Sequence, residues 1–106
     1  MNAFRLQKLK EMEAEKPDDA FLKYAIALEY VSTGADEEAK PYFELLLQQF
    51  PDYVATYLHV GGLYERMGKV TEAMDAYKKG MEAAKKANDN KAYGELNEAL
   101  LLAEDE

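Results

Sequence analysis

The chain has 106 residues, of which 48% are hydrophobic and 32% are charged. This length fits one domain and excludes a two-domain enzyme, and the hydrophobic fraction is high enough for a packed core. The absence of cysteine excludes disulfides, thiolate nucleophiles and thiolate metal ligands. A net charge of −8 argues against nucleic acid and anionic membranes as partners.

The N-terminal sequence does not resemble a signal peptide for export. It lacks the apolar run of about 7–15 residues that a signal peptide needs. No segment approaches the roughly 20 apolar residues of a membrane span. We therefore expect a cytoplasmic protein with no membrane partner.

A helix is predicted first, over residues 2–16. It carries Leu6, Leu9 and Met12 on one stripe and ends at Pro17. We expect residues 1–16 to cap the rest of the fold.

Residues 17–50 then predict a pair of helices. The first runs from about residue 18 to 32 and is ended by Gly34. Asp36 is placed to cap the second helix, which stops before Pro51. Pro41 falls in its first half, where a missing N–H matters least.

Residues 51–87 predict a second pair on the same plan. Asp52 opens one helix and Gly68 ends it, and Thr71 is placed to cap the next. That helix runs to about Ala87.

The second pair repeats the first, position by position, in one fixed register. Pro17 recurs as Pro51, and Gly34 recurs as Gly68. The other matching positions pair residues of similar size: Ile26 with Val60, Tyr30 with Tyr64, Ala39 with Ala73, and Phe43 with Tyr77. Small residues at such positions allow two helices to approach closely, and aromatic residues fill the space beside them.

The last helix is predicted over about residues 90–103. Tyr93, Leu96, Asn97 and Leu100 follow the spacing i, i+3, i+4, i+7, displaced by two residues from the strict period. We expect residues 88–106 to form a C-terminal capping helix and an acidic tail. The fold is then all-α, with about six helices in one domain.

These residues resemble the tetratricopeptide repeat family, whose pattern is an aromatic-x2-Leu-Gly-x2-Tyr, then Ala-x3-Phe, then Pro, on a 34-residue period. The second pair reads Tyr57-x2-Val60-Gly61-x2-Tyr64, then Ala73-x3-Tyr77. The first pair departs at Lys23, where an aromatic is usual, and the second at Lys85, where the closing Pro is usual. The resemblance implies antiparallel helix pairs stacked as a short right-handed α-solenoid.

The sequence offers almost nothing to catalysis. Ser32 is the only serine and His59 the only histidine, and neither stands in a nucleophile or metal-binding motif. Gly61-Gly62 forms no phosphate-binding loop. We expect no enzyme, no metal and no cofactor, and a structural or surface role for His59.

The family resemblance implies a groove lined by the first helices of successive repeats. It places these residues there: Phe21, Tyr24, Leu28, Val31, Leu58, Gly62, Glu65 and Arg66, with His59 beside them. Tyr24 and Leu28 stand where a carboxylate-gripping subgroup has Lys and Asn, so that binding mode is disfavoured. The expected function is a non-catalytic scaffold that binds a protein or peptide segment in an apolar groove.

Two alternatives to an open groove remain. The chain's own terminal helix covers the strip, or a second copy pairs with it to form a homodimer. A basic cluster late in the chain is also open to two interpretations, a solvated face or a contact for an acidic partner. Its members are Lys78, Lys79, Lys85, Lys86 and Lys91.

Overall fold

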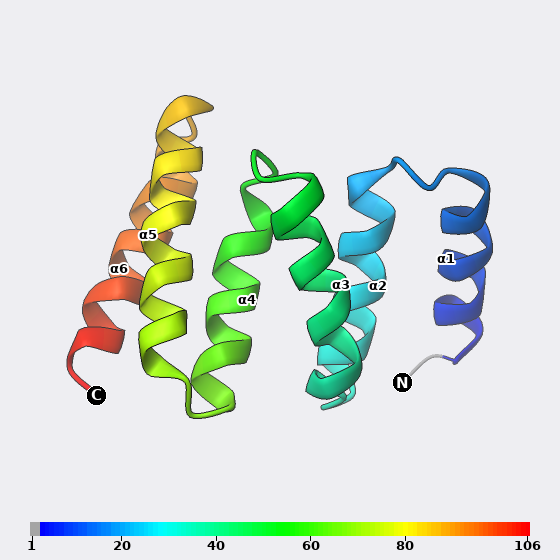
Figure 1. The fold of residues 1–106 in the computed structure, drawn as a ribbon, viewed down its shortest axis with the longest axis horizontal. Coiled ribbons are helices and arrows are strands. Elements are labelled where there is room, and N and C mark those ends of the chain that lie inside the picture. Colours follow the sequence, from blue (N-terminus) through cyan, green and yellow to red (C-terminus); the bar gives the residue numbers. More distant parts are fainter. Residues whose placement is uncertain (1–2) are drawn as a thin grey trace. The chain divides into compact units, whose positions relative to one another are not determined.

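The computed structural model describes residues 3–106, and this range contains six α-helices and no strand (Figure 1). Their bounds are α1 Ala3–Glu15, α2 Ala20–Ser32, α3 Asp36–Gln49, α4 Ala55–Arg66, α5 Val70–Lys86 and α6 Asn90–Glu104. The all-α fold predicted from the sequence is confirmed. Asn2, which the sequence placed in the first helix, lies outside the described residues.

The described chain forms two compact units, one ending at Phe50 and the other beginning at Pro51. In the first unit, α2 packs against both α1 and α3. In the second, α5 packs against both α4 and α6, and α4 also contacts α6 (Figure 1).

Glycine ends the first helix of each pair, as predicted. Gly34 and Gly68 have φ of +78° and +75°, a backbone conformation that residues with a side chain rarely adopt. The next residue turns back onto the helix: the Ala35 N–H donates to the Tyr30 carbonyl at 2.8 Å, and Lys69 does the same to Tyr64 at 2.8 Å. These bonds satisfy carbonyl groups that the helix end would leave without a partner.

The observed starts of α3, α5 and α4 differ from those predicted from the sequence. α3 begins at Asp36 itself, and α5 begins one residue before Thr71, so Ala35 and Lys69 hold the cap positions without a side-chain hydrogen bond. The cause is the glycine turn, because the residue after each glycine already accepts the first helical bond of the next helix through its carbonyl. Asp52 was also misplaced, since it lies in a turn and α4 begins at Ala55.

The core of the first unit lies between α2 and α3. Ile26 and Ala27 of α2 and Ala39 and Phe43 of α3 are all fully buried. By contrast, α1 has no buried residue, and its Phe4 is 75% exposed. The first unit is therefore essentially a helix pair with α1 added at its edge.

Close approach of helices in the second unit depends on two glycines. A Cβ at Gly61 of α4 would overlap the ring of Tyr77 on α5. A Cβ at Gly80 of α5 would overlap Tyr57 and stand 3.0 Å from the side chain of Leu96. The small-against-large pattern read from the sequence thus sets the separation of these helices.

α5 is longer than its counterpart α3, with 17 residues against 14. Lys85 stands where the family pattern has proline, so nothing stops the helix there. The helix instead ends before Asn88, whose φ is +57°. None of the helices formed by residues 3–106 is both long and apolar enough to cross a membrane.

Candidate functional site

α2 presents an apolar stripe on the side away from its buried face. The stripe follows a spacing of three and four residues and consists of Phe21, Tyr24, Leu28 and Val31. Phe21 is 58% exposed and the other three are half-buried. The Asp19 carboxylate fixes the start of the helix by accepting a hydrogen bond from the Phe21 N–H at 2.9 Å.

α4 presents Leu58, Gly62 and Glu65 at the positions equivalent to Tyr24, Leu28 and Val31, with His59 and Arg66 beside them. Leu58, His59, Gly62 and Glu65 are half-buried, and Arg66 is exposed. The sequence predicted an apolar and aromatic groove. The α2 stripe has that character, whereas the α4 face combines one leucine with an imidazole, a carboxylate and a guanidinium.

Gly62 lies beside the Arg66 side chain. A Cβ at Gly62 would meet only the Arg66 Nη1, at 3.5 Å. The missing side chain therefore leaves open space bordered by a guanidinium, one helical turn further along the same helix.

Burial lowers the pKa of His59 below its ordinary value, and the positive charge of Arg66 adds to this effect. The fold therefore favours the neutral form of His59. Across residues 3–106, no group of three or more His, Asp and Glu side chains is arranged to hold a metal ion.

Glu65 connects the α4 face to two other parts of the second unit. Its carboxylate accepts a hydrogen bond from the Tyr77 hydroxyl of α5. Burial, together with this carboxylate, raises the pKa of the Tyr77 phenol far above its ordinary value. A hydrogen bond with Glu65 also raises the pKa of Glu106. Nothing in the residue spacing indicated these contacts.

A buried lysine supports the α2 stripe from behind. Lys23 is only 4% exposed, and its Nζ lies 2.8 Å from the Glu13 Oε2 of α1. The same ammonium donates to the Pro17 carbonyl. The sequence marked Lys23 as a departure from the family pattern but gave no sign of its partners.

Comparison with known proteins defines the class. The model of the tetratricopeptide repeat family matches residues 22–53 and 54–87. A crystal structure of a tetratricopeptide repeat domain protein from Salinibacter ruber is 41% identical and has a TM-score of 0.79, covering 81% of this chain and 97% of that one. A solution structure of a Bordetella parapertussis protein, 23% identical, has a TM-score of 0.80 and covers 97% of this chain and 89% of that one, which shows a common fold.

Curated relatives agree. A tetratricopeptide repeat-containing protein of Pseudomonas aeruginosa is 25% identical over 91 residues, covering 86% of this chain and 87% of the relative. The human protein IFIT1 homolog B is 28% identical over 80 residues, which cover 76% of this chain and 17% of the relative. The chain thus spans less than a fifth of the IFIT1-like relatives that it matches.

Paired helices, glycine-ended first helices and a regular repeat register define a helical-repeat protein. The chain belongs to the tetratricopeptide repeat family. Repeats of this family generally mediate protein–protein interaction.

Proposed function

We propose that the chain is a non-catalytic scaffold that binds a protein or peptide segment through the stripe on α2 and the equivalent positions on α4. One observation carries this proposal. Phe21 is 58% exposed, although it lies on a helix whose opposite face is fully packed.

Exposure of this side chain has an energetic meaning. Burying a phenylalanine side chain is worth about 1.5–3 kcal/mol, and more than half of the Phe21 surface is still in water. Tyr24 and Leu28 continue the stripe and are half-buried, so they extend the apolar surface offered to a partner. An apolar side chain of a bound segment gains affinity here by removing this surface from water.

The α4 positions carry the polar side chains His59, Glu65 and Arg66, so a segment bound there would need polar groups rather than a wholly apolar face.

Three further expectations belong to this proposal. The protein acts in the cytoplasm, it binds neither nucleic acid nor membranes, and it carries no catalytic residue. Self-association is the alternative function, and exposed leucines in α6 favour it: Leu101 is 56% and Leu102 is 63% exposed.

The test is affinity purification of the tagged chain from its own source, comparing Phe21→Ala with Phe4→Ala. Both phenylalanines are exposed, at 58% and 75%, but Phe4 lies on α1, outside the proposed surface. We expect a specific co-purifying protein to be lost with Phe21→Ala and kept with Phe4→Ala.

Reconstitution with that purified protein then measures the loss of affinity directly. Equal retention of the partner by both variants would refute binding through the α2 stripe. If sedimentation shows instead that the chain binds a second copy of itself, self-association is the function.

A further inference from the structure

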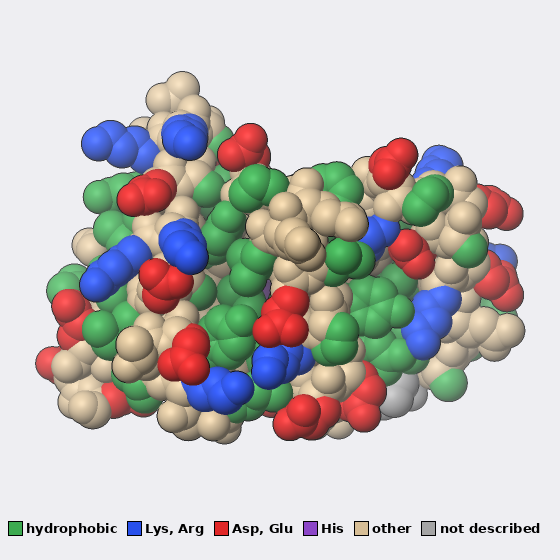
Figure 2. Space-filling view, in the orientation of Figure 1, with side chains coloured by type: hydrophobic (Ala, Val, Ile, Leu, Met, Phe, Trp, Pro, Cys, Tyr) green, Lys and Arg blue, Asp and Glu red, His purple; other side chains and the backbone are tan. Residues whose placement is uncertain are grey.

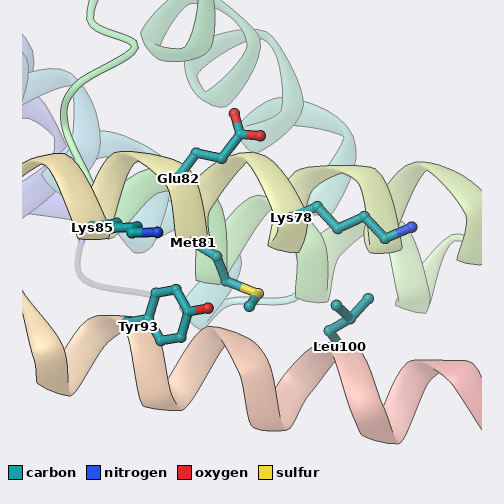
Figure 3. Close-up of a pocket in the computed structure, with 6 residues that line it drawn as sticks. All are labelled: Lys78, Met81, Glu82, Lys85, Tyr93 and Leu100. Atoms are coloured by element: carbon teal, nitrogen blue, oxygen red, sulfur yellow. The ribbon is translucent and has the colours of Figure 1, made fainter.

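A second surface lies on the other side of the second unit, between α5 and α6. It is an open groove of about 230 Å³. Its lining residues are Lys78, Met81, Glu82, Lys85, Tyr93 and Leu100, none of which belongs to α2 or α4 (Figure 3). In Figure 3, Met81 points from α5 toward α6, between Tyr93 and Leu100.

α6 repeats the pattern of α4. Val60 of α4 and Leu96 of α6 hold equivalent positions, and they are 0% and 1% exposed. In the same register Tyr57 corresponds to Tyr93 and Tyr64 to Leu100. α6 is therefore built like the first helix of a pair.

The two tyrosines differ in what covers them. Tyr57 is 5% exposed, because α5 packs over it at Gly80. Tyr93 is 39% exposed, and no helix of the described chain plays the part of α5 for α6. The groove thus lies where a second helix would pack to complete a pair.

The charge around the groove indicates what kind of helix fits it. From Lys78 to Lys86, α5 carries four lysines and one glutamate, in a chain whose net charge is −8. Across residues 3–106, neither Lys78 nor Lys85 forms an ion pair. Figure 2 shows Lys and Arg side chains over α5, with Asp and Glu side chains between them. An incoming helix with acidic side chains beside its apolar stripe complements this rim.

The chain's own α1 does not meet this description. In the repeat register its Arg5 stands where α3 and α5 have Ala39 and Ala73, both 0% exposed. A long cation at that position prevents the close approach that these alanines allow. Arg5 is also engaged in an ion pair with Glu29 of α2, at 2.9 Å.

We propose that the α5–α6 groove binds an amphipathic helix of a partner protein, with acidic residues beside its apolar stripe, as an added second helix completing the pair that α6 begins. This site is independent of the proposed α2 and α4 surface. Met81, Tyr93 and Leu100 anchor the apolar stripe of the bound helix, and Lys78 and Lys85 orient it through its acidic residues.

The probe is a synthetic peptide with the sequence of residues 36–49, blocked at both ends. It carries the stripe that a second helix buries in this fold, Ala39, Phe43 and Leu46, with four acidic residues and one lysine. Amide NMR of the full chain during titration with this peptide should show saturable shifts around Met81, Tyr93 and Leu100.

Two pairs of variants make the test specific. Tyr93→Glu should weaken binding about tenfold or more, whereas Leu101→Glu, on the same helix but outside the groove, should leave it unchanged. The double variant Lys78→Glu/Lys85→Glu should weaken binding, and Lys86→Glu/Lys91→Glu, with the same change in net charge, should weaken it much less. Circular dichroism checks that every variant keeps its helices.

Absence of saturable shifts at the groove would overturn the proposal. So would shifts centred on Phe21 and Leu58, or equal binding by Tyr93→Glu and Leu101→Glu. If the chain alone forms a dimer that Tyr93→Glu dissociates, the occupant is a second copy and the proposed partner is wrong.

Discussion

The Lys23 ammonium and the Tyr57 hydroxyl hold equivalent positions in the two repeats, and each donates to the carbonyl oxygen of an equivalent proline. Tyr57 reaches Pro51 at 2.5 Å, and Lys23 reaches Pro17. A cation therefore replaces a phenol at one repeat position while the hydrogen bond to the preceding turn is kept. Lys23 adds an ion pair with Glu13, which ties α1 to α2.

Removing this lysine should destabilise the fold. Lys23→Ala leaves the Glu13 carboxylate without its cation and the Pro17 carbonyl without its donor, so we expect the free energy of unfolding to fall by about 2–3 kcal/mol. Lys23→Tyr should cost less, because a hydroxyl restores the bond seen at Tyr57. Urea denaturation measures both. As a control, Lys79→Ala breaks an exposed pair with Asp75 and should cost about 0.5 kcal/mol or less; an equal loss for Lys23→Ala would contradict the argument.

The helical glycines should respond to alanine in opposite directions. Gly61→Ala places a methyl group in the Tyr77 ring, so we expect a loss of about 1–3 kcal/mol in unfolding free energy. Gly94 has no atom within 4 Å of the added methyl, so Gly94→Ala should gain about 0.5–1 kcal/mol from helix propensity. Thermal denaturation of the two variants separates these outcomes, and a stabilised Gly61→Ala would show that α4 and α5 lie further apart.

Thr56 offers a stabilising substitution. It is fully buried in α4, and its hydroxyl has no hydrogen-bond partner in the described chain. The equivalent position in the first repeat is the apolar Leu22. Thr56→Val removes the cost of burying that hydroxyl, so we expect about 1 kcal/mol of added stability in urea denaturation. Thr56→Ser, which keeps the hydroxyl and deletes the methyl group, should instead destabilise; a gain there would point to relief of crowding.

Features of this fold that depend on local interactions are predictable from the sequence, whereas contacts between side chains on different helices are not. The repeat register located all the helix pairs, because a glycine after a helix and a small residue opposite an aromatic act through local geometry. The caps at Asp36 and Thr71 were wrong because the glycine turn uses backbone groups that any residue supplies. The bond between Glu65 and Tyr77 was missed because it depends on where two side chains on different helices reach. The binding role of the α2 and α4 positions stays a prediction.

His59 should make stability depend on pH. Its pKa is lowered in the fold, so the unfolded chain binds a proton more readily than the folded chain does. The contribution of neutral His59 is therefore full above its ordinary pKa of about 6.5 and is lost as pH falls from there through the lower pKa of the folded state. Comparing His59→Gln with the parent chain isolates this effect, since both share the same carboxylates. We expect the parent to lose more stability between pH 7 and pH 5 in urea denaturation, and parallel curves would refute it.

Glu65→Gln tests the carboxylate that joins α4 to Tyr77 and Glu106. The amide oxygen still accepts the Tyr77 hydrogen bond, but the negative charge is gone. The pKa of Tyr77 should fall yet stay above its ordinary value, because burial is the first cause of its rise. The pKa of Glu106 should return close to its ordinary value, because Glu65 is the main cause there.

The sign of the linked stability follows from the Glu106 shift. A raised pKa means that the fold favours protonated Glu106, so its contribution is present below the unfolded pKa and is lost as pH rises through the folded one. In Glu65→Gln that dependence should become much weaker, while Glu104→Gln, two residues away at the end of α6, should retain it. NMR titration of the Glu106 side-chain carboxyl and of the Tyr77 ring measures both groups in one sample. If Glu106 titrates alike in the parent and in Glu65→Gln, its carboxyl does not interact with Glu65, and the end of the chain is not held against α4.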